Sequence, residues 1–425
     1  MKVLIINTSE CTGGAAIAAG RLMEALNKSG ISAEMTVLHK KSNKPYVFSH
    51  VSPIRKFMVF AFERLVIWAN NLFSRKNLFK VSIANTGIDV TSLPEFQRAD
   101  IINLHWINQG MLSLDEIKRI IKSGKPTVWT MHDMWECTAI CHCAYECNKF
   151  TEQCGECQYL RFPRKNDLSH KVFLKKLEIF QNSGIHFVAV SSWLKNQAKK
   201  STLLKGCDIS VIPNTLSLSD FTISDKADCR KQYKLAEDKY IILFGAARID
   251  DPIKGFNLLT KSLEYLIMKY PELEDKLHLV LFGNIKDKKL IEQLPINHTY
   301  TGTINDTKEL SKLYSAADVA VSASYYETFG QTIIEAQACG CLPVSFGNSG
   351  QSDIIEHKRN GYLAEYLSVE DLAEGIVWCL KHRNEISDEY LRKTVKDRYD
   401  ISVVAEKYVN LYKTLNTKEN ENTVN

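Results

Sequence analysis

The chain has 425 residues, 45% of them apolar and 24% charged, a composition typical of a soluble globular protein. This length is too great for one ordinary hydrophobic core, so two domains are expected. No stretch of about 18 apolar residues is free of charge, which excludes a transmembrane helix. Residues 1–7 have the pattern of a buried strand and lack the cleavage site of a signal peptide.

The net charge of +5 is unevenly distributed along the chain. Residues 1–215 carry 28 Lys and Arg against 17 Asp and Glu, a net charge of +11, whereas the remainder has a net charge of −6. The basic half should attract an anionic partner such as a membrane surface, a pyrophosphate or a nucleic acid. No zinc-finger, basic-zipper or RNA-recognition pattern occurs, so we expect no nucleic acid partner.

Short apolar runs alternate with helical patterns, which predicts parallel sheets covered by helices on both faces. The expected strands are Val3–Asn7, Ile101–His105, Thr127–His132, His186–Ser191, Ile209–Pro213, Tyr240–Ala246, Leu277–Gly283, Val319–Ser324 and Leu342–Phe346. The pattern indicates an α/β fold with Rossmann-like domains over 1–215 and 216–400. A helix over 401–416 should pack back on the N-terminal domain, and the polar tail 417–425 should be disordered.

A glycine pair follows the first expected strand. Gly13 and Gly14 make a poor dinucleotide fingerprint, because the fingerprint needs three spaced glycines. We interpret the segment as a flexible loop that lies near a bound phosphate. A plain strand-to-helix turn is the alternative.

Residues 55–76 predict a helix with a broad apolar surface and basic flanks. Its apolar side chains include Phe57, Met58, Phe60, Ala61, Leu65, Trp68 and Leu72, and its basic ones are Arg55, Lys56, Arg64, Arg75 and Lys76. Such a helix can lie in a membrane interface. The alternative is an amphipathic helix packed on its own sheet, with its basic ends in water.

Two strands of the first half end in histidine. Ligands of such sheets bind beyond the carboxyl ends of the strands, which places His132 well for contact with a substrate. Asp133 is expected to orient His132 or to bind a second substrate. His105, followed by Trp106, is a weaker candidate, because the pair can also be a packed aromatic corner.

Twelve cysteines are present, and six of them fall between Cys137 and Cys157. The scatter of the others is typical of a reducing compartment, so we expect a cytoplasmic protein. The spacing within this insert predicts a structural zinc site, with the ligands Cys141, Cys147, Cys154 and Cys157. The alternative ligands are Cys137, His142 and Cys143, and the alternative states are free thiols or a redox disulfide.

The second half contains two stretches suited to a diphosphate and a sugar. Arg248 and Lys254 lie six residues apart on a strand-to-helix loop, where they can converge on a diphosphate. A helix should begin near Gln331, and its unpaired N–H groups suit an anion. Glu327 and Glu335 flank that helix start, and a carboxylate can bind two sugar hydroxyls. Capping and solvent-facing acids are the alternative for this pair.

These residues resemble motifs of glycosyltransferase family 4. Glu327 and Glu335, with Phe329 and Gly330 between them, are similar to its E-x7-E motif, and Arg248 with Lys254 is similar to its Arg/Lys pair. Residues 211–214 resemble its interdomain Pro-Asn segment, and residues 338–340 its Ala-Cys-Gly. The Gly13–Gly14 loop also fits, and the matches keep the family order from residue 2 to about residue 375.

The resemblance implies a GT-B fold, with two Rossmann-like domains facing across a cleft, and transfer of a sugar with retention of anomeric configuration. The implied donor is a nucleoside-diphosphate sugar, bound by Gly13, Gly14, Arg248, Lys254, Phe329, Gly330, Gln331 and Glu335. Glu335 would bind the ribose, while Glu327 and His132 would contact the transferred sugar as catalytic residues. No catalytic metal is implied, and the acceptor would lie near His105 and Asp133.

We therefore expect a hexosyltransferase of bacterial polysaccharide biosynthesis. Its expected acceptor is a lipid-linked saccharide, which it extends by one sugar. The expected location is the cytoplasm, with peripheral contact to the inner face of the membrane through residues 55–76. A GT-B sugar-nucleotide epimerase and a non-catalytic nucleotide-sugar-binding protein are the alternative functions. The sequence does not identify the donor base, the donor sugar or the linkage.

Overall fold

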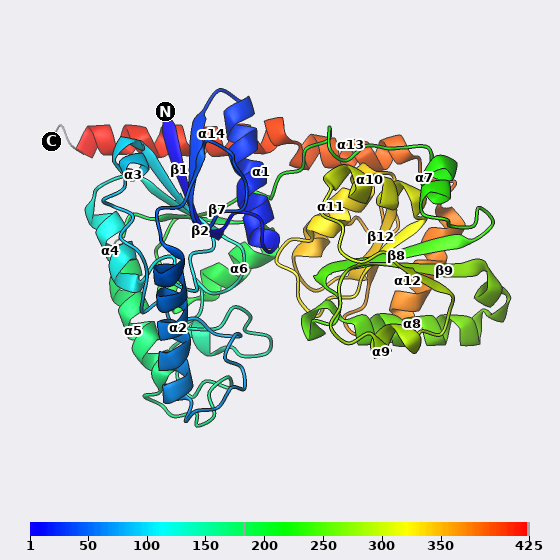
Figure 1. The fold of residues 1–425 in the computed structure, drawn as a ribbon, viewed down its shortest axis with the longest axis horizontal. Helices are drawn as coiled ribbons and strands as arrows, with labels where there is room; N and C mark the ends of the chain where they lie inside the picture. Colours follow the sequence, from blue (N-terminus) through cyan, green and yellow to red (C-terminus); the bar gives the residue numbers. More distant parts are fainter. Residues whose placement is uncertain (182, 423–425) are drawn as a thin grey trace. The chain divides into compact units, whose positions relative to one another are not determined.

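The computed structural model describes residues 1–181 and 183–422, with side chains up to residue 417 (Figure 1). The chain forms two compact units, which we call unit 1 and unit 2. Unit 1 comprises Met1–Thr215 and the residues from Val404 onward, and unit 2 comprises Leu216–Val403. Each unit has its own parallel sheet covered by helices, which confirms the predicted α/β class with two Rossmann-like domains.

Unit 1 is built on a seven-stranded parallel sheet with the order β3-β2-β1-β4-β5-β6-β7. The strands are β1 (Lys2–Ser9), β2 (Ser32–His39), β3 (Val47–Phe48), β4 (Ile101–Leu104), β5 (Thr127–Met131), β6 (His186–Ala189) and β7 (Ile209–Val211). Helices cover both faces, so the central strands consist of near-continuous apolar runs that the sequence analysis could recognise. It missed β2, because Ser32, Glu34 and Thr36 interrupt the apolar pattern.

Seven helices accompany this sheet within the described residues. They are α1 (Gly14–Lys28), α2 (Pro53–Asn70), α3 (Pro94–Arg98), α4 (Leu114–Lys122), α5 (Leu168–Phe180), α6 (Ser192–Lys200) and α14 (Ile401–Asn422), with the 3-10 turns η1 (Lys149–Thr151) and η2 (Thr202–Leu204). Helix α14 packs against the sheet of unit 1, where Tyr408 and Tyr412 join the core around Val3 and Ile5 (Figure 1). The Tyr412 hydroxyl also accepts a hydrogen bond of 2.7 Å from the Asn103 amide of β4.

Unit 2 is built on a six-stranded parallel sheet with the order β10-β9-β8-β11-β12-β13. The strands are β8 (Tyr240–Arg248), β9 (Leu277–Asn284), β10 (His298–Tyr300), β11 (Val319–Ser322), β12 (Leu342–Phe346) and β13 (Tyr362–Ala364). The sequence analysis missed β10 and β13, the two edge strands, because each has only three residues. Such short runs carry too little periodicity to be recognised.

Helices cover both faces of the second sheet as well. They are α7 (Lys226–Gln232), α8 (Phe256–Lys269), α9 (Lys289–Glu292), α10 (Thr307–Ala316), α11 (Gln331–Ala338), α12 (Val369–His382) and α13 (Asp388–Tyr399), with η3 (Pro252–Lys254), η4 (Pro271–Lys276) and η5 (Gly350–Asp353). Helices α8 and α12 lie together on one face, and α10 and α11 lie on the other (Figure 1). This arrangement leaves the carboxyl ends of β8 and β11 to be shaped by loops.

Two predicted helix boundaries were wrong. The helix expected over 55–76 is α2, which ends at Asn70, because Leu72 and Phe73 take left-handed backbone angles with φ of 46° and 58°. Helix α14 continues to Asn422 instead of ending at 416, since neither Gly nor Pro follows to stop it. The last part of the expected disordered tail, residues 423–425, lies outside the described residues.

Candidate functional site

The most ligand-like arrangement in unit 2 lies beyond the carboxyl ends of the neighbouring strands β8 and β11. Lys254, in the loop after β8, places its Nζ 2.6 Å from Oε1 of Glu327, in the loop after β11. The backbone joins the same two loops, because the Tyr325 N–H donates to the Ile253 carbonyl at 2.9 Å. The structure thus brings together two residues that the sequence analysis had assigned to different parts of a donor.

Lys254 keeps its positive charge beside Glu327. Burial alone would lower the pKa of Lys254, but the neighbouring Glu327 carboxylate outweighs burial and raises that pKa above its usual value. Lys254 is therefore a fixed cation at neutral pH. The Glu327 side chain holds its orientation because Ser324 Oγ donates to it at 2.9 Å.

Serine residues that the sequence analysis missed complete this loop cluster. Ser349 Oγ accepts a hydrogen bond of 3.2 Å from the Glu327 N–H, and the Gly350 N–H donates to the Glu327 carbonyl at 2.8 Å. Ser324 is the last residue of the expected strand Val319–Ser324, so its position at a strand end was a usable signal. Ser349 carried no such signal, because nothing in the sequence pairs residue 349 with residue 327.

Two glycines give the ligand-facing loops their shape. Gly255 precedes α8 with a φ of 68°, and a Cβ at this position would lie 1.9 Å from the Ala323 carbonyl oxygen at the end of β11. Only glycine permits both the backbone angle and the close approach that carries Lys254 toward Glu327. Gly330 precedes α11 with a φ of 112°, and its carbonyl accepts a hydrogen bond of 3.1 Å from the Ile333 N–H in the first turn of that helix.

The other residues of unit 2 that were predicted to bind the sugar donor each have a different environment. Arg248 ends β8, and its Nε lies 3.1 Å from Oδ1 of Asp250, with 43% of the side chain exposed. Glu335 is buried within α11, where its Oε2 accepts a hydrogen bond of 3.2 Å from the Tyr314 hydroxyl. Phe329 is also buried, with its ring packed edge-on against another ring of unit 2. Any contact of Phe329 with a donor therefore involves its backbone.

In unit 1 two adjacent strands are joined twice at their carboxyl ends. His105 directly follows β4 and His132 directly follows β5, and His105 Nδ1 lies 2.8 Å from His132 Nε2. The next residue of each loop forms the second link, because Trp106 Nε1 donates to Oδ2 of Asp133 at 2.8 Å. These two links form one cluster at this sheet edge, made of His105, Trp106, His132 and Asp133.

Both histidines of this cluster are neutral at neutral pH. Burial lowers the pKa of His132 to about 4 and holds the pKa of His105 well below its usual range. One ring therefore donates and the other accepts in the bond between them. His105 Nε2 is buried and has no hydrogen-bond partner among the described residues.

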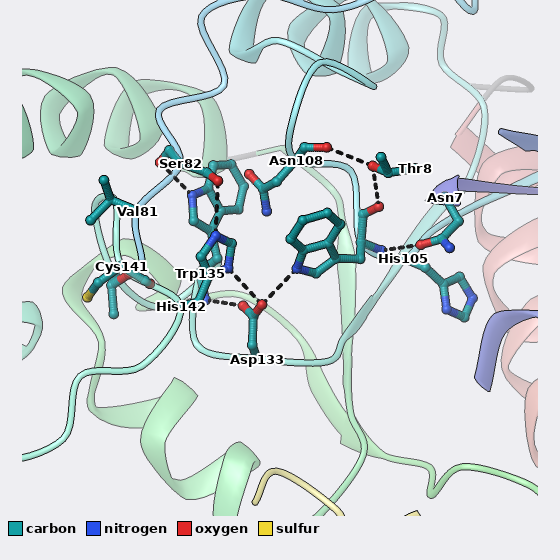
Figure 2. Close-up of polar contacts among 12 residues, drawn as sticks. Asn7, Thr8, Val81, Ser82, His105, Asn108, Asp133, Trp135, Cys141 and His142 are labelled. Carbon is teal, nitrogen blue, oxygen red and sulfur yellow. Dashed lines mark hydrogen bonds and ion pairs between the residues drawn. The ribbon is translucent and has the colours of Figure 1, made fainter. Parts of the chain in front are cut away.

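The Asp133 carboxylate receives three hydrogen bonds (Figure 2). Oδ2 accepts from Trp106 and pairs with His142 Nδ1 at 2.8 Å, and Oδ1 accepts from the Trp135 N–H at 2.7 Å. Burial alone would raise the pKa of Asp133, but the charge of His142 and these hydrogen bonds hold it below its usual value. Asp133 is therefore ionised and engaged by three segments of unit 1.

The glycine pair lies at the same edge of the sheet as His105 and His132, because β1 is parallel to β4 and precedes α1. Gly13 is the residue before α1 and has a φ of 90°, with open space around the position of a Cβ. Its conformation therefore requires glycine, while the space beside it remains available. Thr8, near the end of β1, ties this strand to the cluster, since its Oγ1 donates to the Trp106 carbonyl at 2.9 Å (Figure 2).

The cysteine-rich insert has no metal-binding arrangement in the described part of the chain. No group of three or more His, Cys, Asp or Glu side chains there is arranged to hold a metal ion, and the cysteines are free thiols. Burial raises the pKa of Cys154 and of Cys157 to about 11, so both are protonated thiols in the absence of a bound metal. Both ring nitrogens of His142 are also engaged, by Asp133 and Ser82. The zinc site stays a prediction.

Helix α2 exposes several large apolar side chains and buries a charged pair. Its solvent-facing side chains Ile54, Phe57, Met58, Phe62 and Leu65 are 53–73% exposed and lie at helical spacing on one face, which we call the α2 apolar face. Its buried face carries the ion pair of Glu63 with Arg64, whose atoms Oε2 and Nη2 lie 2.7 Å apart. Among the described helices, none is long and apolar enough to cross a membrane.

Comparison with known proteins agrees with this organisation. The family model described as Glycosyltransferase Family 4 matches residues 12–220, and the model described as Glycosyl transferases group 1 matches residues 225–398. The uncharacterized glycosyltransferase MJ1607 of Methanocaldococcus jannaschii is 26% identical over 371 residues, covering 80% of this chain and 90% of that protein.

Solved structures share the fold at low sequence identity. The sucrose-phosphate synthase of Thermosynechococcus elongatus superposes with a TM-score of 0.65 at 19% identity, covering 97% of this chain and 98% of that one. Anabaena HepE, solved in complex with UDP-glucose, superposes with a TM-score of 0.63 at 14% identity, covering 97% of this chain and 100% of that one. Two Rossmann-like units with this likeness define the GT-B class of folds.

The matched models lie in the order expected for that class, one on each unit. The chain is a GT-B glycosyltransferase of the family 4-like type, and it is a transferase enzyme. This confirms the activity class that the motifs predicted. It also disfavours the epimerase and the non-catalytic binder as alternatives.

Proposed function

We propose that the protein is a retaining glycosyltransferase that moves a hexose from a nucleoside-diphosphate sugar to a saccharide acceptor. The Lys254–Glu327 pair carries this proposal, because it places a fixed cation and a sugar-binding carboxylate together at the carboxyl ends of β8 and β11. Anabaena HepE was solved with UDP-glucose, which supports a nucleotide sugar as the donor. We further propose that the acceptor is a lipid-linked saccharide of bacterial polysaccharide biosynthesis.

The donor diphosphate would replace Glu327 as the counterion of Lys254. Arg248 is exposed and can turn toward the same phosphates, and the positive end of the α11 helix dipole would favour their negative charge. These groups would stabilise the negative charge that grows on the leaving nucleoside diphosphate. Glu335 would bind the ribose, and Glu327, released from Lys254, would bind hydroxyls of the transferred sugar.

The reaction would break the bond from the anomeric carbon to the phosphate oxygen and form a bond to the acceptor oxygen on the same face. The acceptor hydroxyl would pass its proton to the departing phosphate oxygen, so no protein nucleophile is needed. Neutral His132 would contact the donor sugar by a hydrogen bond, a role that suits an imidazole with a pKa of about 4. Trapping a sugar covalently on a side chain would contradict this mechanism.

A thermal-shift screen against UDP-, GDP-, ADP- and CMP-sugars tests the donor. A ligand that binds only the folded protein raises the melting temperature, so one nucleotide class should stabilise the parent. The double variant Arg248→Ala/Lys254→Ala should lose this shift, whereas Lys261→Ala, an exposed lysine on α8, should keep it. No stabilisation by any nucleotide sugar would contradict the proposed donor.

Product analysis separates transfer from other uses of the donor. NMR spectroscopy of the incubated donor and a saccharide panel should show a new glycoside with the donor's anomeric configuration. Rearrangement of the donor alone would indicate the epimerase. Donor binding without turnover by any acceptor would indicate a binding protein.

We propose that the α2 apolar face docks on an anionic lipid surface. Arg55 and Lys56 lie beside it, and 1–215 has a net charge of +11. The exposed rings of Phe73 and Phe162 extend the apolar area beyond the helix. Their segments are joined, because the Arg161 N–H donates to the Asn71 side chain. Apolar area framed by cations suits lipids whose headgroups are negative.

Flotation with vesicles of phosphatidylglycerol and phosphatidylethanolamine tests this docking. The parent should float, and Phe57→Ser/Leu65→Ser and Arg55→Glu/Lys56→Glu should each remain in solution. Lys199→Glu/Lys200→Glu on α6 is the matched control, because it changes two adjacent exposed lysines elsewhere in unit 1. Arg64 is left intact, since its buried pairing makes it unsuitable for this test. Unchanged flotation of both α2 variants, or a stable dimer in place of vesicle binding, would contradict the lipid partner.

A further inference from the structure

The insert between β5 and α5 reaches back to the strand-end cluster through His142. The Nδ1 atom of the His142 ring lies 2.8 Å from Asp133 Oδ2, and its Nε2 lies 3.0 Å from Ser82 Oγ (Figure 2). The His142 carbonyl also accepts a hydrogen bond of 3.0 Å from the Met134 N–H. His142 is thus bonded by backbone and side chain to the loop that follows β5.

The ring of His142 has one orientation that satisfies both partners. Asp133 is an acceptor only, so Nδ1 carries the proton that it donates to Oδ2. Nε2 then faces the Ser82 hydroxyl, which can donate to a neutral ring or accept from a charged one. The Ser82 bond therefore fixes the ring in the position that presents a donor to Asp133.

The segment that carries Ser82 is itself immobilised from two sides. The Ser82 N–H donates to the Ile140 carbonyl at 2.8 Å, and the Ser82 carbonyl accepts from the Trp135 indole at 2.9 Å (Figure 2). On the other side, Glu63 Oε1 accepts from the Ile83 N–H at 2.8 Å. The buried acid of α2 thus anchors the segment against which His142 is held.

His142 also borders the indole that Asp133 holds. The ring centroids of Trp106 and His142 lie 5.5 Å apart, and the two rings donate to the same oxygen of Asp133. Removing His142 would leave Asp133 with one donor fewer and would leave the Trp106 ring without its neighbour. Trp106 follows His105, so its displacement would alter the surface beside the two strand ends.

We propose that His142 is a positioning residue for the acceptor side of the transfer reaction, acting by holding Asp133 and, through it, the indole of Trp106. This inference rests on the proposed function, in which unit 1 receives the acceptor saccharide. The insert therefore contributes to the acceptor surface through the His142 side chain. Neither Asp133 nor His142 takes part in the bond-making step.

The direct test is the Trp106 indole resonance in the full-length chain labelled with [15N]tryptophan. The chain has six tryptophans, and Trp106→Phe assigns the resonance. In His142→Phe we expect this resonance to move and its exchange with solvent to accelerate, because the bond to Asp133 loosens. His142→Asn keeps an N–H donor near the Nδ1 position and should restore much of the parent spectrum. His170→Phe, a histidine elsewhere in unit 1, should leave the Trp106 resonance unchanged.

The kinetic test uses whichever nucleotide sugar and saccharide are turned over by the parent. His142→Phe should raise the acceptor KM about tenfold, the effect of losing one hydrogen bond to a charged group, with little change in donor KM. A parent-like Trp106 resonance and acceptor KM in His142→Phe would overturn the proposal. If that variant does not fold, Ser82→Ala, which frees the ring, must show the same changes in weaker form. Absence of turnover by the parent would contradict the proposed function alone, since the indole comparison needs no substrate.

Discussion

The strand ends of the two units are built on opposite principles. In unit 1, His105 and His132 are neutral and bonded to each other, and the Asp133 carboxylate is held by the Trp106 and His142 rings and by one backbone N–H. In unit 2, Lys254 and Glu327 form an ion pair whose partners are 31% and 19% exposed. A buried, internally bonded cluster resists rearrangement, whereas a partly exposed ion pair can exchange one partner for a ligand's charge. The comparison indicates a rigid surface in unit 1 and an exchangeable binding site in unit 2.

Replacing Lys254 should have the largest effect on activity. Lys254→Ala removes the fixed cation from the proposed diphosphate site, so we expect turnover to fall about 10²- to 10³-fold, the usual cost of losing one charge-stabilising group. Steady-state kinetics with the nucleotide sugar identified by thermal shift would measure this. Lys261→Ala should retain parental turnover. If Lys254→Ala were equally active, the ion pair of unit 2 would not be a binding site for the donor.

Gly255 tests whether the exchangeable site depends on backbone geometry. Gly255→Ala combines a left-handed φ with a Cβ that overlaps the Ala323 carbonyl oxygen, so we expect a loss of about 2–4 kcal/mol in the free energy of unfolding of unit 2. Gly302→Ala is the matched control, because Gly302 has a similar φ of 75° but open space at the Cβ position. It should cost about 1–2 kcal/mol. If urea denaturation showed the same loss of unfolding free energy in both variants, the close approach of Gly255 to Ala323 would not require glycine.

The rigid cluster of unit 1 should be sensitive to acid. Folding lowers the pKa of His132 to about 4, so between about pH 6.5 and pH 4 the unfolded chain binds the proton that the folded chain excludes. The resulting stability is present above pH 6.5 and is lost as the pH falls toward 4. From this residue we expect the free energy of unfolding to be about 1–2 kcal/mol lower at pH 5 than at pH 7.

Urea denaturation of His105→Asn/His132→Asn at both pH values isolates this effect. The double variant should lose less stability between pH 7 and pH 5 than the parent does. His298→Asn changes an exposed histidine of unit 2 and should keep the parental dependence. The same pH dependence in all three proteins would mean that the neutral histidine pair does not distinguish unit 1 from unit 2.

Much of the fold could be predicted because its strongest signals are local. The central strands β1, β4, β5, β8 and β11 are apolar runs, since burial on both faces of a parallel sheet requires apolar side chains throughout. Strand β2 and the short edge strands gave weaker signals and were missed. The end of α2 was also misplaced, because the left-handed turn at Leu72 and Phe73 uses residues with no preference for it.

The sequence predicted which residues belong to the candidate site, but it did not predict which of them contact one another. Lys254 and Glu327 were both recognised, yet nothing in the spacing indicates that they form an ion pair with each other. His142 was considered only as a metal ligand, because its bond to Asp133 depends on how the insert folds back. Arg64 was counted among the basic flanks of an exposed helix, whereas it lies buried against Glu63.

By itself, the sequence determined the class of protein. Apolar periodicity specifies parallel sheets, and glycine and charged residues after particular strands specify a transferase of this fold, since both kinds of signal are carried by residues close together in the chain. The tertiary structure decided which side chains meet. Lys254 meets Glu327 and His142 meets Asp133 only because separate loops converge at the carboxyl ends of adjacent strands, and that convergence depends on packing between residues distant in the chain.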